Sequence, residues 1–223
     1  MPVDISSLLH VLAHELRTPA GIAQGYLRML LEDRLTEAAD RRRAIEQTQK
    51  ALARVGELTM ESSRLARWLD EQHDAPRSAI DAHVLATRVA NDAGIEPLRA
   101  KVDVPPESIA ITTVDGDALA GALVSLVKVT AREMNNQPCA MVARLSGKRT
   151  MDVLIGQEQQ FDALSAGPDA PGAVPLGVER GGVGLSLVLA AAILETHGAR
   201  QWVIDGTRTT VGIRFPFEER SHQ

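Results

Sequence analysis

The 223-residue sequence is short of several features, and each shortage excludes a class of protein. A single cysteine, Cys139, allows neither an internal disulfide nor a CxxC motif. The longest apolar run, residues 185–194, is about half the length that a transmembrane helix needs, and no signal-peptide pattern opens the chain. Basic residues are outnumbered by acidic ones, 24 to 29, and they form no stripe that would bind a polyanion. We therefore expect a cytoplasmic protein that binds neither nucleic acid nor a membrane.

The sequence contains enough hydrophobic residues to form a buried core, with 44% hydrophobic and 24% charged residues. From Ile5 to about residue 69 the apolar residues recur at alternating steps of three and four, which is typical of helices with one apolar face. A short connection near residues 32–40 predicts an antiparallel hairpin. One hairpin leaves its apolar faces partly uncovered, so we expect a second copy of the chain to complete a dimeric four-helix bundle.

The helical pattern stops near residues 70–79, which predicts a domain boundary, with residues 1–74 as the hairpin and residues 75–223 as a second domain. The second domain mixes helical and β-rich segments, and helices gathered against one mixed sheet indicate an α/β sandwich. The predicted helices lie near residues 83–93, 117–133 and 183–197, and the predicted strands near residues 100–104, 109–114, 139–146, 150–156, 200–205 and 210–217. The predicted fold class is therefore a helical hairpin followed by an α/β sandwich.

Residues 14–20 read HELRTPA and place a histidine, an acid and a base within the first helix. If Leu9, Leu12 and Leu16 point inward, then His14 faces solvent on the opposite side of that helix. An unperturbed imidazole is mostly neutral at pH 7 and carries a free lone pair, so an exposed one is a candidate nucleophile. The alternative is that the stretch is the ordinary polar surface of a helix.

The residues around His14 add to the case for a reactive site. Glu15 is adjacent and could hydrogen-bond one ring nitrogen, while Thr18 lies one turn later on the same face as His14. Pro19 has no N–H for the carbonyl of Glu15, so we expect a bend in the helix just past the histidine.

HELRTP, in a helical hairpin that precedes an α/β domain, resembles the H-box of the sensor histidine kinases, and the resemblance extends over nearly the whole chain. It implies that His14 is the phosphoacceptor, that Glu15 assists phosphoryl transfer, and that Thr18 positions water for dephosphorylation of a response regulator. Arg17 and Pro19 complete the motif as supporting residues. The second domain resembles the Bergerat-type ATP-binding domain of the same family.

The second domain departs from that family at its nucleotide-binding positions. Residues 115–131 match the helix whose asparagines hold Mg²⁺, but Ser125 and Val129 stand where the asparagines are expected. Valine offers no oxygen to a hard cation. The aspartate that reads adenine falls on Gly156 or Gln157, and the paired glycines that follow it in the family are missing.

The last glycine-rich motif of the family survives in part as GGVGLSL, residues 181–187, with Ser186 in place of a third glycine. Gly182 and Gly184 either present backbone N–H groups to a phosphate or let a helix start tightly against the sheet. His197, at the end of that helix, is interpreted as a residue favoured by the helix dipole rather than as a catalytic group.

A complete phosphoacceptor motif beside a degenerate nucleotide site predicts a histidine phosphotransferase of a phosphorelay. Such a protein would pass a phosphoryl group between receiver-domain aspartates through His14, as a homodimer, with no bound ATP and no metal of its own, because the receiver contributes Mg²⁺. Two alternatives stay open. One is a non-enzymatic pseudokinase or scaffold that docks response regulators, and the other is a histidine kinase with a divergent ATP site.

Overall fold

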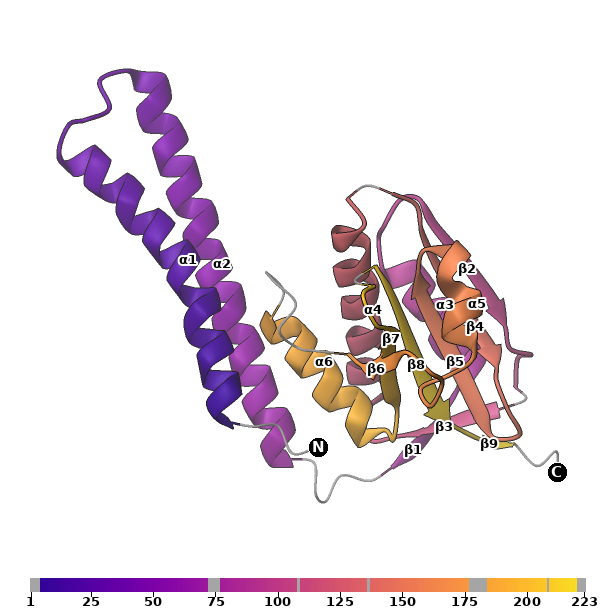
Figure 1. The fold of residues 1–223 in the computed structure, drawn as a ribbon. Helices are drawn as coiled ribbons and strands as arrows, with labels where there is room; N and C mark the ends of the chain where they lie inside the picture. Colours follow the sequence, from indigo (N-terminus) through magenta and orange to yellow (C-terminus); the bar gives the residue numbers. More distant parts are fainter. Residues whose placement is uncertain are drawn as a thin grey trace. The chain divides into compact units, whose positions relative to one another are not determined.

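A computed structural model describes residues 5–71, 77–107, 109–135, 137–176, 184–207 and 209–219 of the chain. The chain divides into two compact units, which are described separately (Figure 1). One unit comprises Met1–Leu69 with Glu179–Val188, and the other comprises Asp70–Val178 with Leu189–Gln223. The predicted domain boundary between residues 74 and 75 lies outside the described residues. Among the described residues, no helix is both long enough and apolar enough to cross a membrane.

Helices α1 (Ile5–Leu31) and α2 (Ala38–Glu71) form the predicted hairpin and run side by side (Figure 1). The buried residues of α2 recur at helical spacing, which gives the helix one inward face. This face is built from small residues in its first half and from leucines in its second half, and it consists of Ala44, Thr48, Ala51, Leu58 and Leu65.

Some apolar residues that were expected to point inward in a dimeric bundle are exposed in the single chain. Leu9 was expected to point inward, but 59% of its surface is exposed in the single chain. Ile45 and Leu52 are likewise 49% and 54% exposed, because the neighbouring alanines, Ala44 and Ala51, take the inward positions instead. Small side chains let two helices approach closely, and the bulky residues beside them are then left at the surface.

The second unit contains a six-stranded mixed sheet of order β2-β4-β5-β8-β7-β6. Strands β2 and β4 are parallel, and the other neighbouring pairs are antiparallel. The bounds of these strands are β2 (Leu98–Asp103), β4 (Cys139–Leu145), β5 (Thr150–Gly156), β6 (Ala173–Pro175), β7 (Arg200–Ile204) and β8 (Thr210–Pro216). An antiparallel three-stranded sheet of order β1-β3-β9 accompanies it, with β1 (Ser78–Asp81), β3 (Ile109–Thr113) and β9 (Glu218–Glu219).

The helices that follow the hairpin match the three predicted ones closely, and two short elements are added. They are α3 (Ala82–Asp92), α4 (Gly116–Glu133), the 3₁₀ turn η1 (Glu158–Gln160), α5 (Phe161–Ser165) and α6 (Gly184–Thr196). Aspartates cap two of them: Asp81 Oδ1 accepts from the Val84 N–H at 3.0 Å, and Asp115 accepts from two N–H groups of the first turn of α4. The helical hairpin and the α/β domain of the predicted fold class are confirmed.

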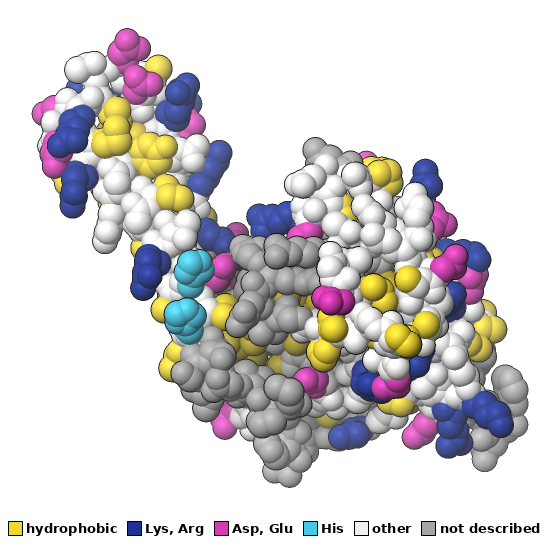
Figure 2. Space-filling model, in the orientation of Figure 1, with side chains coloured by type: hydrophobic (Ala, Val, Ile, Leu, Met, Phe, Trp, Pro, Cys, Tyr) yellow, Lys and Arg dark blue, Asp and Glu magenta, His cyan; other side chains and the backbone are white. Residues whose placement is uncertain are grey.

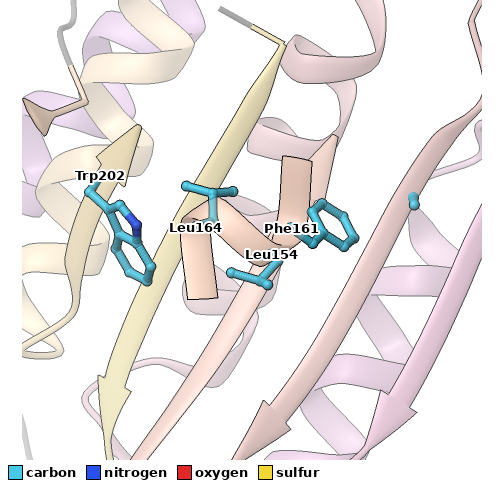
Figure 3. Packing of buried hydrophobic residues seen from close by; sticks show 5 residues of the cluster. Leu154, Phe161, Leu164 and Trp202 are labelled. Atoms are coloured by element: carbon cyan, nitrogen blue, oxygen red, sulfur yellow. The ribbon is translucent and has the colours of Figure 1, made fainter. Parts of the chain in front are cut away.

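Strand β5 is buried along nearly its whole length because both faces of the sheet are covered. Helix α4 contacts β5 on one face. On the other face, α5 contributes Phe161 and Leu164 to a fully apolar cluster with Leu154 of β5 and Trp202 of β7 (Figure 3). Trp202 lies over Gly212 of β8, where a Cβ atom would come within 2.4 Å of the indole ring, so only glycine fits there.

One buried ion pair joins the two central strands of the sheet. Asp152 of β5 is fully buried and faces Arg214 of β8, whose Nε and Nη2 donate to its two carboxylate oxygens at 2.7 and 2.8 Å. Ser146 Oγ donates a third hydrogen bond to Oδ1 at 2.7 Å. Hydrogen bonding to Asp152 is the main cause that raises the pKa of Arg214. The pair fixes the β5–β8 register, since a slip of one residue would leave a buried charge unpaired.

Candidate functional site

His14 lies in the middle of α1 and its side chain is exposed, as predicted. Arg17 and Thr18, in the next turn, are exposed as well. Figure 2 shows histidine side chains (cyan) at the surface of the hairpin. Pro19 is buried inside α1, and the helix continues through it to Leu31, so the bend expected there stays a prediction. The imidazole of His14 is therefore presented to solvent on a continuous helix, where another protein can reach it.

Glu15 has a partner that the sequence does not reveal. Its side chain is only 12% exposed, and Oε2 lies 3.8 Å from an Nη atom of Arg54 on α2. Arg54 also donates to Glu57 Oε2 at 3.1 Å. The acid next to His14 is thus held by the second helix, whereas the sequence suggested a hydrogen bond to the imidazole. Nothing in the pattern of α1 alone could have identified Arg54, because it belongs to the other helix.

The helix that matches the Mg²⁺-binding helix of the family is α4, and its apolar ladder of Leu119, Leu123 and Leu126 is buried as expected. Ser125 turns its hydroxyl back into the helix and donates to the Gly121 carbonyl at 2.9 Å. Val129 is buried. A divalent cation that prefers oxygen ligands does not fit these residues, since one offers a hydroxyl already used within the helix and the other offers no oxygen.

Gly156 and Gln157, the two positions on which the family's aspartate falls, lie at the end of β5. Gly156 is the last residue of the strand and pairs with Thr210 of β8. Its φ is 130°, and a Cβ atom at this position would lie 2.1 Å from the carbonyl oxygen of Thr209. No residue with a side chain fits this backbone, so an aspartate cannot stand here.

The polar groups around Gly156 are bonded to one another. The Gln157 N–H donates to Thr210 Oγ1 at 3.3 Å, and the same hydroxyl hydrogen-bonds Gln160 of η1. The Gln157 side chain donates to Gln137 Oε1 at 2.8 Å. Thr210, Gln160 and Gln137 were not singled out by the sequence, because they come from separate segments that only the fold brings together. The amide of Gln157 is therefore engaged with another glutamine.

The remaining glycine-rich motif lies only partly within the described residues. Gly182 falls outside them, whereas Gly184 begins α6 and Ser186 is half-buried in its first turn. Leu185 and Leu187 on either side of Ser186 are buried. The helix is mostly core, as expected for its apolar sequence.

His197, just past the end of α6, is a buried neutral group rather than a charge at a helix terminus. Nδ1 lies 2.6 Å from the carbonyl of Ile193, and Nε2 lies 2.7 Å from the hydroxyl of Thr113 in β3. With the Nδ1 proton donated to that carbonyl, Nε2 accepts from Thr113. Burial lowers the pKa of His197 from its ordinary value of 6.5, and this is the largest effect on it. Burial thus disfavours the protonated form that a helix dipole would favour, an effect that the dipole interpretation left out.

Within the described residues, no group of three or more His, Cys, Asp or Glu side chains is placed to hold a metal ion. The candidate site in the hairpin is thus the exposed imidazole of His14. In the α/β domain, the described positions that the resemblance matches to ligands carry internal hydrogen bonds or apolar side chains, or are glycine.

Comparison with known proteins finds the fold but no sequence relative. No protein-family model and no curated protein sequence matches the chain. Among solved structures, histidine kinase AdeS of Acinetobacter baumannii superimposes with a TM-score of 0.55 at 15% identity, covering 91% of this chain and 97% of that one. Full-length ShkA, in complex with AMPPNP, superimposes with a TM-score of 0.52 at 17% identity, covering 96% of this chain and 46% of ShkA. The chain has the fold of these two proteins, a helical hairpin followed by an α/β domain.

Proposed function

We propose that this chain, which has the fold of a sensor histidine kinase, is a cytoplasmic histidine phosphotransferase of a two-component phosphorelay. The observation that carries the proposal is the contrast between its two units. His14 is exposed within an intact HELRTP segment. Of the two positions where the family's aspartate can fall, Gly156 has no room for a side chain, and Gln157 donates its amide to Gln137. The phosphoryl group therefore comes from another protein rather than from ATP.

The proposed transfer needs only chemistry that an exposed imidazole can perform. The free ring nitrogen of His14 attacks the phosphorus of an aspartyl phosphate on a receiver domain. The bond between phosphorus and the aspartate oxygen breaks, and the carboxylate leaves. In the second half, the aspartate of another receiver attacks phospho-His14 and releases the neutral imidazole. Positioning and charge stabilisation dominate such transfers, and the receiver contributes Mg²⁺ and a lysine.

The side chains next to His14 have supporting roles in this proposal. Glu15, held by Arg54 at 3.8 Å, orients or stabilises the imidazole as charge develops on it. Thr18, exposed one turn later, positions water for dephosphorylation of a receiver. Arg17 and Pro19 shape the surface on which the receiver docks.

We also propose that the protein works as a homodimer. The hairpin exposes several bulky apolar side chains, among them Leu9, Leu27, Ile45, Leu52 and Leu69. Bulky apolar side chains exposed on a helical hairpin favour an interface with another protein surface. A second hairpin would cover these residues and complete a four-helix bundle, leaving His14 on the outside.

Two other functions fit the same fold. ShkA, which has this fold, was solved with AMPPNP, so a histidine kinase that binds its nucleotide in a divergent way is one alternative. The other is a pseudokinase or scaffold that docks response regulators, in which His14 is no longer used.

One experiment separates the three functions. The protein is incubated with labelled ATP and, in a separate reaction, with a labelled phosphorylated receiver domain, and His14→Ala is the control in both. Label from the receiver alone, lost in His14→Ala, supports the phosphotransferase. Label from ATP identifies a kinase, and the absence of label from either donor leaves the scaffold.

A further inference from the structure

Two exposed histidines, His10 and His14, lie one helical turn apart on α1. Residues four apart on a helix are neighbours, with about 5–6 Å between their Cβ atoms. The spacing holds here because α1 is one continuous helix from Ile5 to Leu31. Within the described part of the chain, neither imidazole is engaged in a hydrogen bond or an ion pair. Two unengaged imidazoles therefore share one face of the helix.

We propose that His10 and His14 together bind one divalent transition-metal ion, of the class of Zn²⁺, Cu²⁺ or Ni²⁺, and that this ion blocks phosphoryl transfer at His14. The binding itself stands on the arrangement of the two side chains. The block rests on the proposed phosphotransferase function.

The spacing of the two histidines allows both imidazoles to bind the same metal ion. Two imidazoles at positions i and i+4 of a helix are an established way to ligate one zinc ion from one face, and imidazole also suits copper and nickel. No further His, Cys, Asp or Glu completes a three-ligand group among the described residues, so water fills the other positions. Arg17, one turn past His14, is exposed and adds an unfavourable charge nearby. The site is therefore open and its binding reversible, unlike that of a structural zinc centre.

Metal binding and phosphoryl transfer exclude each other at His14 for an electronic reason. A neutral imidazole has one nitrogen with a free lone pair, and its other nitrogen carries a proton. The metal takes that lone pair, so none remains to attack phosphorus. Mg²⁺, which prefers oxygen ligands, does not compete for the imidazoles, so the cation supplied by a receiver leaves the site free.

The binding is tested on the full chain with ZnCl₂ as the probe, by isothermal titration, against His10→Gln and His14→Gln. A third variant, His10→Gln with Ala13→His, keeps the number of histidines but places two of them at adjacent positions, which do not face each other. We expect each variant to bind zinc at least about tenfold more weakly than the unmodified chain, because the second imidazole no longer adds to the first. Equal affinity in all four proteins overturns the metal site.

The block is tested by phosphoryl transfer from a labelled receiver to His14 as zinc is increased. The unmodified chain loses label as zinc binds and regains it with EDTA, whereas His10→Gln keeps its label at the same zinc concentration. Any effect of zinc on the receiver is shared by both proteins and cancels in the comparison. Equal loss of label in both overturns the block. If neither accepts label without zinc, the proposed function fails, and the titration alone decides the metal site.

Discussion

The polar side chains at the candidate sites of the hairpin and of the α/β domain differ in whether they have internal hydrogen-bond partners. On α1, His14 is exposed and has no internal partner among the described residues. At the end of β5, the Thr210 hydroxyl bonds both the backbone of Gln157 and the side chain of Gln160, and Ser125 bonds its own helix. A polar group without an internal partner is available to an incoming one, and a satisfied group is not. This difference favours the proposal that the hairpin reacts with a partner while the α/β domain has no nucleotide chemistry of its own.

The backbone at the end of β5 also bears on the proposal that the nucleotide site is degenerate. A substitution alone could be reversed by restoring the lost side chain. The carbonyl of Thr209, however, occupies the space that a Cβ at Gly156 would need. The α/β domain has the sheet and helices of the fold, and the end of β5 leaves no room for a side chain at Gly156.

The largest expected effect comes from removing the exposed imidazole of His14. His14→Ala should lower phosphoryl acceptance from a phosphorylated receiver by at least about 10³-fold, because the only proposed nucleophile is lost. The exposed position means that the fold is retained, which circular dichroism checks. His10→Gln is the matched control and should accept phosphate normally in metal-free buffer. Acceptance that persists in His14→Ala would remove His14 from the mechanism.

An aspartate introduced at the end of β5 should not create nucleotide binding. Gly156→Asp restores the type of residue that the family pattern calls for, but we expect it to lower the free energy of unfolding by about 4 kcal/mol and to gain no affinity for ATP. The cause is the Cβ position 2.1 Å from the Thr209 carbonyl oxygen. Gly172→Asp is the control, because Gly172 also has a positive φ but has open space around it. A stable Gly156→Asp protein that binds Mg-ATP in a titration would break the comparison.

The buried ion pair tests whether the α/β domain is held by its internal polar bonds. Asp152→Asn should lower the free energy of unfolding by about 3 kcal/mol, because it leaves the guanidinium of Arg214 without its carboxylate. Asp169→Asn breaks the exposed pair with Arg200 and should change stability little. Denaturant unfolding measures the free energy of unfolding of both variants. Equal losses of stability would show that the buried ion pair contributes no more than the exposed one.

The smallest expected effect is a dependence of stability on pH through His197. Burial lowers the pKa of His197 below its ordinary value of 6.5. Between the two pKa values, His197 is therefore protonated in the unfolded chain and neutral in the folded chain. Stability from this group should therefore be full above pH 6.5 and should fall as the pH is lowered through that window. Thermal unfolding of the chain and of His197→Gln measures it, and parallel pH profiles would contradict the assignment of a neutral, buried imidazole.

Long elements with a clear apolar period were predictable from the sequence, and short ones were not. Residues 117–133 were predicted as a helix and form α4, and residues 150–156 were predicted as a strand and form β5. Strands β1, β6 and β9 have at most four residues each, too few to show a period, and they were missed.

The candidate site was predictable only where a single helix determines it. The exposure of His14 follows from the spacing of α1. The partners of Glu15 and Gln157, Arg54 and Gln137, lie on other segments, and one sequence does not show which segments meet. Leu9, Ile45 and Leu52 are exposed in the single chain, so the inward face expected for them stays a prediction that needs a second hairpin.

The most direct test of the central claim is to follow His14 with a phosphorylated receiver in buffer that contains no nucleotide. Mass spectrometry of the intact chain and of its α1 peptide reports whether a phosphoryl group is added and at which residue. The account predicts rapid transfer to His14 from the receiver, and no modification when the same protein is given Mg-ATP alone. Phosphorylation of His14 by Mg-ATP in the absence of any receiver would contradict it.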